Sequence, residues 1–109
     1  MKLRDKKTIA RVLLMVGSAL SVFSVTSQAA DPNAGRNLSA TCALCHGTDG
    51  KGVGAFPALA GQDKAVLAIK LKDFKAGKGS PTIMHQLSKG FSDEQIDLMA
   101  VHFSTQSPR

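Results

Sequence analysis

Residues 42–46 read Cys42-Ala43-Leu44-Cys45-His46, and this stretch contains both cysteines of a chain of 109 residues. Cysteines three positions apart lie on the same side of a helical turn, because side chains at i and i+3 are neighbours there. A histidine directly after the second cysteine is held close to both thiols. The fold must therefore accommodate whatever these three side chains bind together.

Covalent attachment of a haem accounts for all three side chains at once. A c-type haem has two vinyl groups, and each can form a thioether with one thiol, so Cys42 and Cys45 can hold the two sides of one porphyrin. The imidazole of His46 then lies under the iron as its proximal ligand. We predict one covalently bound haem c, with thioethers at both cysteines and His46 as an axial iron ligand.

Three other interpretations of the cysteine pair fit the sequence less well. A disulfide between residues three apart would close a very small loop and would add little stability. A thioredoxin-like redox pair needs a βαβ context, and no segment of this chain alternates with the period of a strand. A zinc site would need a fourth ligand, and the chain has no second pair of cysteines.

The N-terminus has the pattern of a secretory signal peptide. Residues 2–11 are charged, residues 12–25 are apolar apart from small residues, and Ser27-Gln28-Ala29 is a small-x-small cleavage site. The apolar stretch is shorter than the roughly 20 residues that a membrane-spanning helix needs. We predict that residues 1–29 are cleaved on export to the periplasm, which leaves no permanent membrane anchor and a single domain over residues 30–109.

The net charge of +6 is concentrated before the cleavage site. Residues 1–29 have five basic side chains and one acid, whereas residues 30–109 have nine Lys or Arg and seven Asp or Glu. This near balance does not provide the basic face that phosphate binding needs, so we expect no nucleic-acid partner. A domain of 80 residues with no Trp, no Tyr and two cysteines also needs a cofactor to complete its core.

The first helix is expected from Asp31-Pro32 to about Cys45, because aspartate caps helices well and proline is favoured at the first helical position. Residues 47–61 hold five of the ten glycines, which indicates an irregular loop.

Two further helices follow the loop. Apolar residues at helical spacing predict an amphipathic helix over residues 62–76, closed by Gly77. Ser92-Asp93-Glu94-Gln95 is a capping box and predicts the start of the last helix. The apolar stripes are Leu67, Leu71 and Phe74 in the first of these helices, and Ile96, Met99, Ala100 and Phe103 in the last.

Across residues 31–104 the chain resembles the class I, single-haem cytochrome c family. The resemblance is carried by Cys42-Cys45-His46, Gly47-Thr48-Asp49-Gly50, Phe56-Pro57-Ala58-Leu59-Ala60-Gly61-Gln62, and a methionine followed by a helix that ends in Phe103. It implies an all-α cytochrome c fold, in which three to four short helices wrap around one covalently bound haem and the first helix packs on the last. It implies that Gly35 gives room for this packing, and that the carbonyl of Pro57 accepts a hydrogen bond from the ring of His46, which makes the ligand more basic.

The sixth iron ligand is expected downstream of the motif. Met84 follows Pro81 in a short segment from which a thioether can approach the iron, and it matches the ligand methionine of the resembled family. Met99 lies on the apolar stripe of the last helix, where a core role is the ordinary expectation. His85 and His102 stay open as alternatives, because histidine is the next commonest ligand. Otherwise we expect His85 to be a partly exposed neighbour of the ligand and His102 to lie at the helix surface.

Ligation by His46 and Met84 would fill both axial positions of the iron. Iron without an open position binds substrates poorly, so we expect single-electron transfer rather than catalysis. A haem enzyme or sensor, such as a peroxidase, is the alternative if the sixth position is open or displaceable.

A closer resemblance concerns the redox partner. Ser80-Pro81-Thr82-Ile83-Met84 and Ser88-Lys89-Gly90-Phe91-Ser92 are similar to the haem domain of the cytochrome subunit of flavocytochrome c sulfide dehydrogenase. The resemblance implies a flavin-containing sulfide dehydrogenase subunit as electron donor. The alternative is a free shuttle that delivers electrons to a terminal oxidase or another cytochrome.

Five lysines fall within fifteen residues between the loop and Pro81. They can form a basic face that steers acidic redox partners, or simply the solvated side of a helix, which is the commoner outcome. These lysines are Lys64, Lys70, Lys72, Lys75 and Lys78.

Overall fold

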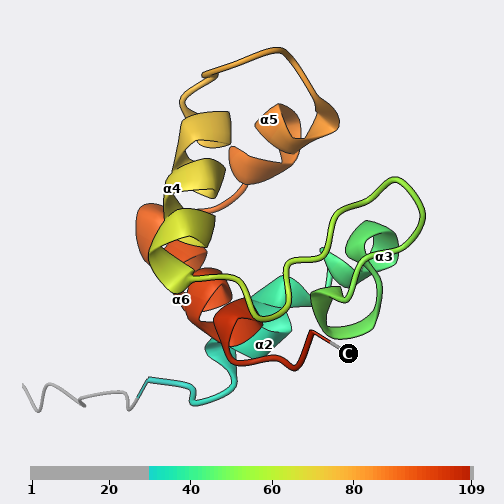
Figure 1. The fold of residues 1–109 in the computed structure, drawn as a ribbon. Helices are drawn as coiled ribbons and strands as arrows, with labels where there is room; N and C mark the ends of the chain where they lie inside the picture. Colours follow the sequence, from blue (N-terminus) through green and yellow to red (C-terminus); the bar gives the residue numbers. More distant parts are fainter. Residues whose placement is uncertain (1–29, 109) are drawn as a thin grey trace, which may run out of the picture.

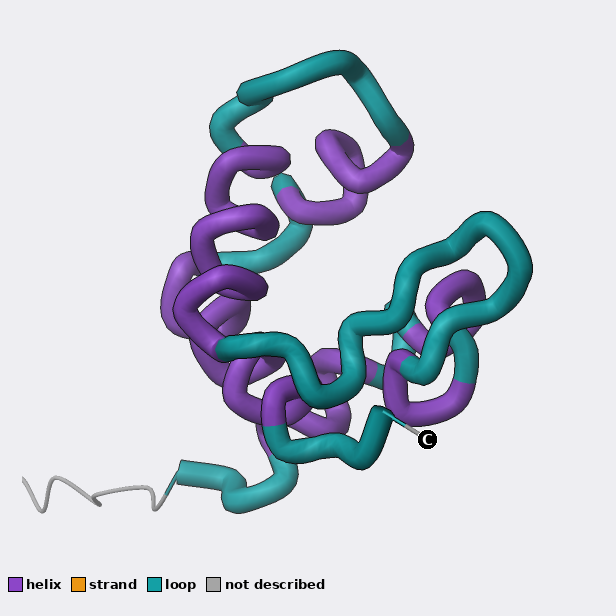
Figure 2. Tube along the Cα trace, viewed as in Figure 1, coloured by secondary structure: helices purple, strands orange, loops and turns teal. Residues whose placement is uncertain are grey.

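A computed structural model describes residues 30–108, which form short helices joined by loops (Figure 1, Figure 2). In chain order the elements are α2 (Ala34–Ser39), α3 (Ala43–His46), the 3₁₀ helix η1 (Thr48–Gly50), α4 (Lys64–Lys75), α5 (Ile83–Ser88) and α6 (Asp93–Ser104). Over the described residues the only extended pairing is an isolated bridge between Val53 and Phe56, so the expected all-α class is confirmed. The predicted signal peptide, residues 1–29, lies outside the described residues. None of the described helices is long and apolar enough to cross a membrane.

The N-terminal helix differs from the prediction because it is split into α2 and α3. The backbone stays in the right-handed helical region at Ala40 and Cys42. However, the amides of these two residues bond three positions back, to Asn37 and Ser39, and not four. This tighter turn separates the two helices and changes the direction of the chain just before the cysteine motif. The expected start at Asp31-Pro32 is also wrong, because α2 begins at Ala34 with Asn33 in the N-cap position and no side-chain cap. The carboxylate of Asp31 instead accepts a hydrogen bond of 2.8 Å from the Asn33 amide in the turn before the helix.

The helix expected over residues 62–76 is α4. The carboxylate of Asp63 caps it by accepting the amide hydrogens of Ala65 and Val66 at 2.9 and 3.1 Å. The helix ends at Lys75, since Gly77 takes a φ of +78°, which glycine adopts without steric cost. Leu67 is buried and the other two members of the apolar stripe are half-buried.

Helix α6 begins as the sequence predicts. The Ser92 hydroxyl accepts the Gln95 amide hydrogen at 3.2 Å, and the Gln95 side chain accepts the Ser92 amide hydrogen at 2.9 Å. All four members of the predicted stripe are buried, and together with Ala60 and Leu67 they form the apolar core of the described chain. The stripe members are Ile96, Met99, Ala100 and Phe103.

Helices α2 and α6 pack closely, so the first and last helices of the described chain meet (Figure 1). A Cβ atom at Gly35 would lie 2.6 Å from the carbonyl oxygen of Leu98, well inside van der Waals contact. The missing side chain of Gly35 therefore allows the two backbones to approach, as the family resemblance implies.

Two ion pairs cross from α4 to α6. Lys72 Nζ lies 2.7 Å from a carboxylate oxygen of Asp97, and Lys75 Nζ lies 2.8 Å from one of Asp93. The hydrogen bond to Asp97 raises the pKa of Lys72, and the hydrogen bond from Lys75 lowers the pKa of Asp93. Because these pairs are exposed to solvent, they orient the two helices more than they stabilise them.

Replacing Gly35 with alanine is expected to destabilise the protein by about 1–3 kcal/mol, since the new methyl group must push α2 away from α6. Chemical denaturation of the haem-loaded protein, followed by far-ultraviolet circular dichroism, measures this loss. Gly90→Ala is the matched control, because its new Cβ would meet nothing closer than the Leu87 carbonyl at 3.4 Å. Equal unfolding midpoints for the two variants would contradict the close approach at Gly35.

Candidate haem site

The loop after α3 folds back onto the helix that carries the cysteine motif. The carbonyl of Gly50 accepts the amide hydrogens of Leu59 and Ala60 at 2.6 and 2.9 Å, and the carbonyl of Phe103 accepts that of Gly61 at 2.9 Å. Gly50 packs directly on the Phe103 ring, since a Cβ there would lie 2.7 Å from it. These contacts attach the loop to α6 and place Pro57 above His46.

The ring of His46 is oriented by one strong hydrogen bond. Its Nδ1 lies 2.7 Å from the carbonyl oxygen of Pro57. A carbonyl oxygen only accepts, so Nδ1 must carry the hydrogen and Nε2 must hold the free lone pair. His46 is 7% exposed, and Phe56 packs edge-on to it at 6.0 Å between ring centroids. Within residues 30–108 no hydrogen bond occupies Nε2, so this nitrogen is available to a metal.

Both cysteines are free thiols on one turn of the chain. Cys42 stands in the N-cap position of α3, and the Cys45 amide donates a hydrogen bond of 3.2 Å to the Cys42 carbonyl. Burial raises the pKa of the Cys42 thiol above its ordinary value, whereas Cys45 is exposed. A half-buried and an exposed sulfur three residues apart suit two thioether links to one flat group. The described residues contain no cluster of three or more His, Cys, Asp or Glu that could hold a metal ion.

Met84 lies in the first turn of α5 and is half-buried. Its amide donates a hydrogen bond of 3.2 Å to the hydroxyl of Thr82, the residue that caps this helix. Helix α5 packs against α4, whereas α3 stands on a separate arm of the molecule (Figure 1). His46, on α3, and Met84, on α5, therefore lie in two separate parts of the molecule, which α4 and α6 connect. We call these two parts the arms.

His85 differs from the expectation of a partly exposed neighbour, because it is buried, with 6% of its surface exposed. Its Nε2 lies 2.7 Å from the carbonyl of Lys78, and its Nδ1 accepts the amide hydrogen of Thr82 at 3.1 Å. The ring also packs edge-on against Phe74, with 5.1 Å between centroids. Both ring nitrogens are committed to the backbone, so His85 offers no lone pair to iron.

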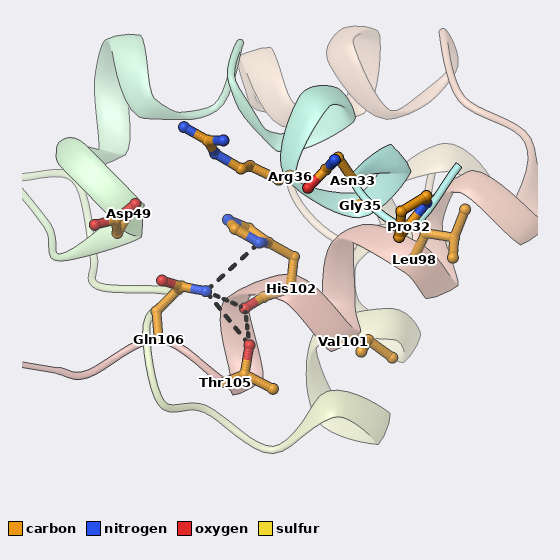
Figure 3. Close-up of a pocket in the computed structure, with 10 residues that line it drawn as sticks. All are labelled: Pro32, Asn33, Gly35, Arg36, Asp49, Leu98, Val101, His102, Thr105 and Gln106. Atoms are coloured by element: carbon orange, nitrogen blue, oxygen red, sulfur yellow. Dashed lines mark hydrogen bonds between the residues drawn. The ribbon is translucent and has the colours of Figure 1, made fainter. Parts of the chain in front are cut away.

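His102 is half-buried where α6 meets α2, beside an open pocket of about 440 Å³ (Figure 3). The side-chain nitrogen of Gln106 lies 3.5 Å from Nδ1 of His102 and donates a hydrogen bond of 2.9 Å to the backbone carbonyl of His102. The pocket is lined by Pro32, Gly35 and Asp49 among others, but not by the cysteines, His46 or Met84. The geometry therefore places His102 in the contact between the terminal helices, and Met84 is the better candidate for the sixth ligand.

The apolar surface of the described chain fits a large flat cofactor. Several large apolar side chains are exposed on the two arms, including Leu44, which directly precedes the second cysteine and is 87% exposed. The buried core is small, and its largest members lie on α6. A porphyrin would cover such side chains and add the apolar volume that the core lacks. The exposed apolar residues of the two arms are Leu44, Val53, Phe56, Ile83 and Leu87.

The contacts of His85 were not expected from the sequence. A signal for them was present, because Thr82 and His85 are three residues apart at the start of a helix, which is the spacing of a capping box. Histidine at the third helical position is not the glutamate or glutamine that usually identifies this motif, and so the box was missed.

Comparison with known proteins gives consistent matches. Residues 33–105 match the family model described as Cytochrome c. The cytochrome subunit of sulfide dehydrogenase from Chlorobaculum tepidum is 35% identical over 107 residues, which cover 92% of this chain and 94% of that protein.

Two further similarities involve longer proteins. The thiosulfate dehydrogenase electron acceptor from Stutzerimonas stutzeri is 38% identical over 94 residues, which cover 79% of this chain and 44% of that protein. The solved structure of cytochrome c4 from Acidithiobacillus ferrooxidans superposes with a TM-score of 0.60 at 29% identity, covering 72% of this chain and 53% of that one. The chain spans about half the length of these two relatives.

Proposed function

The chain belongs to the cytochrome c family, and from that premise we propose that His46 and Met84 would be the two protein ligands of the iron of its haem c. Cytochromes of this family are electron carriers, and a bound haem c supplies an iron that takes up and releases single electrons. The observation that carries the proposal is the His46 ring, whose Nδ1 is held 2.7 Å from Pro57 while its Nε2 is free.

Each residue of the proposed site has a separate physical task. Cys42 and Cys45 anchor the porphyrin through thioethers, so that it stays bound in both oxidation states. The Pro57 carbonyl fixes the tautomer of His46 and makes its Nε2 a better donor. The thioether of Met84 is a soft ligand that favours the reduced iron and therefore raises the potential. With both axial positions filled, the chain transfers electrons and does not catalyse a reaction on a bound substrate.

We also propose that residues 1–29 direct export to the periplasm and are then removed. The support is the order of a charged segment, an apolar stretch and a small-x-small site at Ser27-Gln28-Ala29. Haem c attachment after export would leave residues 30–109 as one haem domain.

The proposed electron donor is the flavin-containing subunit of a sulfide dehydrogenase. Support comes from the Chlorobaculum relative, which is named as the cytochrome subunit of such an enzyme, and from the relative named as an electron acceptor of thiosulfate dehydrogenase. A lasting interface would use the apolar side chains that stay exposed at the haem edge once the porphyrin is bound, since exposed apolar patches usually mark contact surfaces.

The ion pairs of the structure weaken the competing interpretation as a free shuttle. Lys72, Lys75 and Lys78 bond to Asp97, Asp93 and Asp73 within the chain, so three of the five clustered lysines already have acidic partners. A shuttle that docks through lysines would rely on the remaining two, Lys64 and Lys70.

Haem attachment and export are checked by one intact-mass measurement on protein from the periplasm. We expect a chain that begins at Ala30 or Asp31 and carries one haem that stays bound in acidified organic solvent. Changing Cys42 and Cys45 to serine should abolish both the retained haem and cooperative unfolding, because an 80-residue domain has little other core. A mass that includes residues 1–29 would contradict cleavage, and haem lost to the solvent would contradict the thioethers.

Met84→Ala is expected to lower the reduction potential and to let carbon monoxide or cyanide bind the iron, because the sixth ligand is lost. The oxidised wild type should show the weak near-infrared band of iron–methionine ligation, and the variant should lack it. Met99→Leu is the matched control. Because Met99 is buried in the core on α6, this variant should leave the band intact. Loss of the band in Met99→Leu alone would overturn the assignment.

The partner is tested by reducing the cytochrome with the candidate flavoprotein and sulfide as salt is raised. At about 1 M salt the Debye length is about 3 Å, so a complex held by charge should dissociate, whereas an apolar interface should survive. We expect reduction to stay fast and the complex to stay intact. Reduction that slows at modest salt, and slows further in Lys70→Ala, would identify a free shuttle; no reduction at all would exclude this donor.

A further inference from the structure

Both ring nitrogens of His85 have hydrogen-bond partners. It is buried, and its three partners come from three places in the chain: the carbonyl of Lys78, the amide of Thr82 and the ring of Phe74. The carbonyl of Lys78 only accepts, so Nε2 carries the hydrogen and Nδ1 is the acceptor for Thr82. None of these contacts is explained by attachment of the haem or by electron transfer.

These bonds continue directly to the backbone of Met84. The His85 ring holds the Thr82 amide at 3.1 Å, and the Thr82 hydroxyl holds the Met84 amide at 3.2 Å. The Thr82 carbonyl in turn accepts the His85 amide hydrogen at 3.1 Å. The first turn of α5, which carries the methionine, is thereby closed on both sides of residue 84.

The loop before α5 has few other attachments. Gly77 and Gly79 both have positive φ, and a Cβ at either would meet nothing within 4 Å, so this segment lies open to solvent. Lys78 is tied to Asp73 at the end of α4, through its amide at 2.9 Å and its ammonium at 2.9 Å. Beyond Lys78, the His85 ring is the group that links the loop to the start of α5.

We propose that His85 is a positioning residue that holds Met84 in place for the iron by tying the Lys78 carbonyl to the Thr82 amide. The ring acts through the backbone and is not itself a ligand, because both of its nitrogens are occupied. This inference rests on the proposed ligation by Met84. It differs from a purely structural role because it requires the iron–sulfur bond itself to weaken when the ring is removed.

The test uses the haem-loaded protein with His85→Ala and His85→Gln. Cyanide binds the oxidised iron only when the methionine has left it, so the binding rate reports how often the bond opens. We expect His85→Ala to bind cyanide about tenfold faster or more, with a weaker near-infrared band and a lower potential, since two hydrogen bonds are lost. His85→Gln should recover part of each effect, because glutamine at this position of a capping box can still accept the Thr82 amide hydrogen, as Gln95 does for Ser92.

Gln95→Ala is the matched control. It removes the same side of the capping box from α6, which carries no proposed ligand, and should lower stability without changing the band or the cyanide rate. The proposal is overturned if His85→Ala keeps the wild-type band and rate, or changes them no more than Gln95→Ala does. It is also overturned if His85→Gln recovers nothing. Absence of the band in the wild type would instead refute ligation by Met84, and the His85 proposal with it.

Discussion

The hydrogen bond between the His46 ring and the Pro57 carbonyl joins the helix that carries the cysteine motif to the loop that follows it. At 2.7 Å it fixes which nitrogen faces outward, and it requires the loop after α3 to return over the histidine. The loop can return because Gly50 packs on Phe103 and because Gly61 bonds to the Phe103 carbonyl. The orientation of one imidazole thus depends on α6, which begins nearly fifty residues later, and the site is a product of the whole fold and not of a local motif.

Features with a local physical cause were predictable from the sequence. The capping box at Ser92 and Gln95 needs only neighbouring residues, and so does the end of α4 at Gly77. The cysteine motif is equally local, because the spacing of Cys42, Cys45 and His46 alone is enough to predict a covalently bound haem. The close approach at Gly35 is a long-range contact, and it was expected only because the chain resembles a family in which the terminal helices pack together.

Features that depend on tertiary context were not predictable. The break between α2 and α3 has no glycine or proline to mark it, and it shows only in two hydrogen bonds, at Ala40 and Cys42, that span three residues instead of four. The burial of His85 depends on Phe74 and on the Lys78 carbonyl, which the loop brings together in space. The pairing of Lys72 and Lys75 with acids on α6 has the same origin. From the sequence alone, the run of lysines can be taken for a docking face. The packing of α4 on α6 gives Lys72 and Lys75 acidic partners within the chain.

The contact between α2 and α6 has a consequence for the order in which the molecule is assembled. It joins residues about sixty positions apart, so a large loop must close before these helices bury each other. The closing partner, α6, is the last of the described helices and is synthesised after the others. A polypeptide that crosses a membrane N-terminus first therefore cannot complete this contact until α6 has also passed through. The thiols of Cys42 and Cys45 stay accessible to an attachment machinery over the same interval.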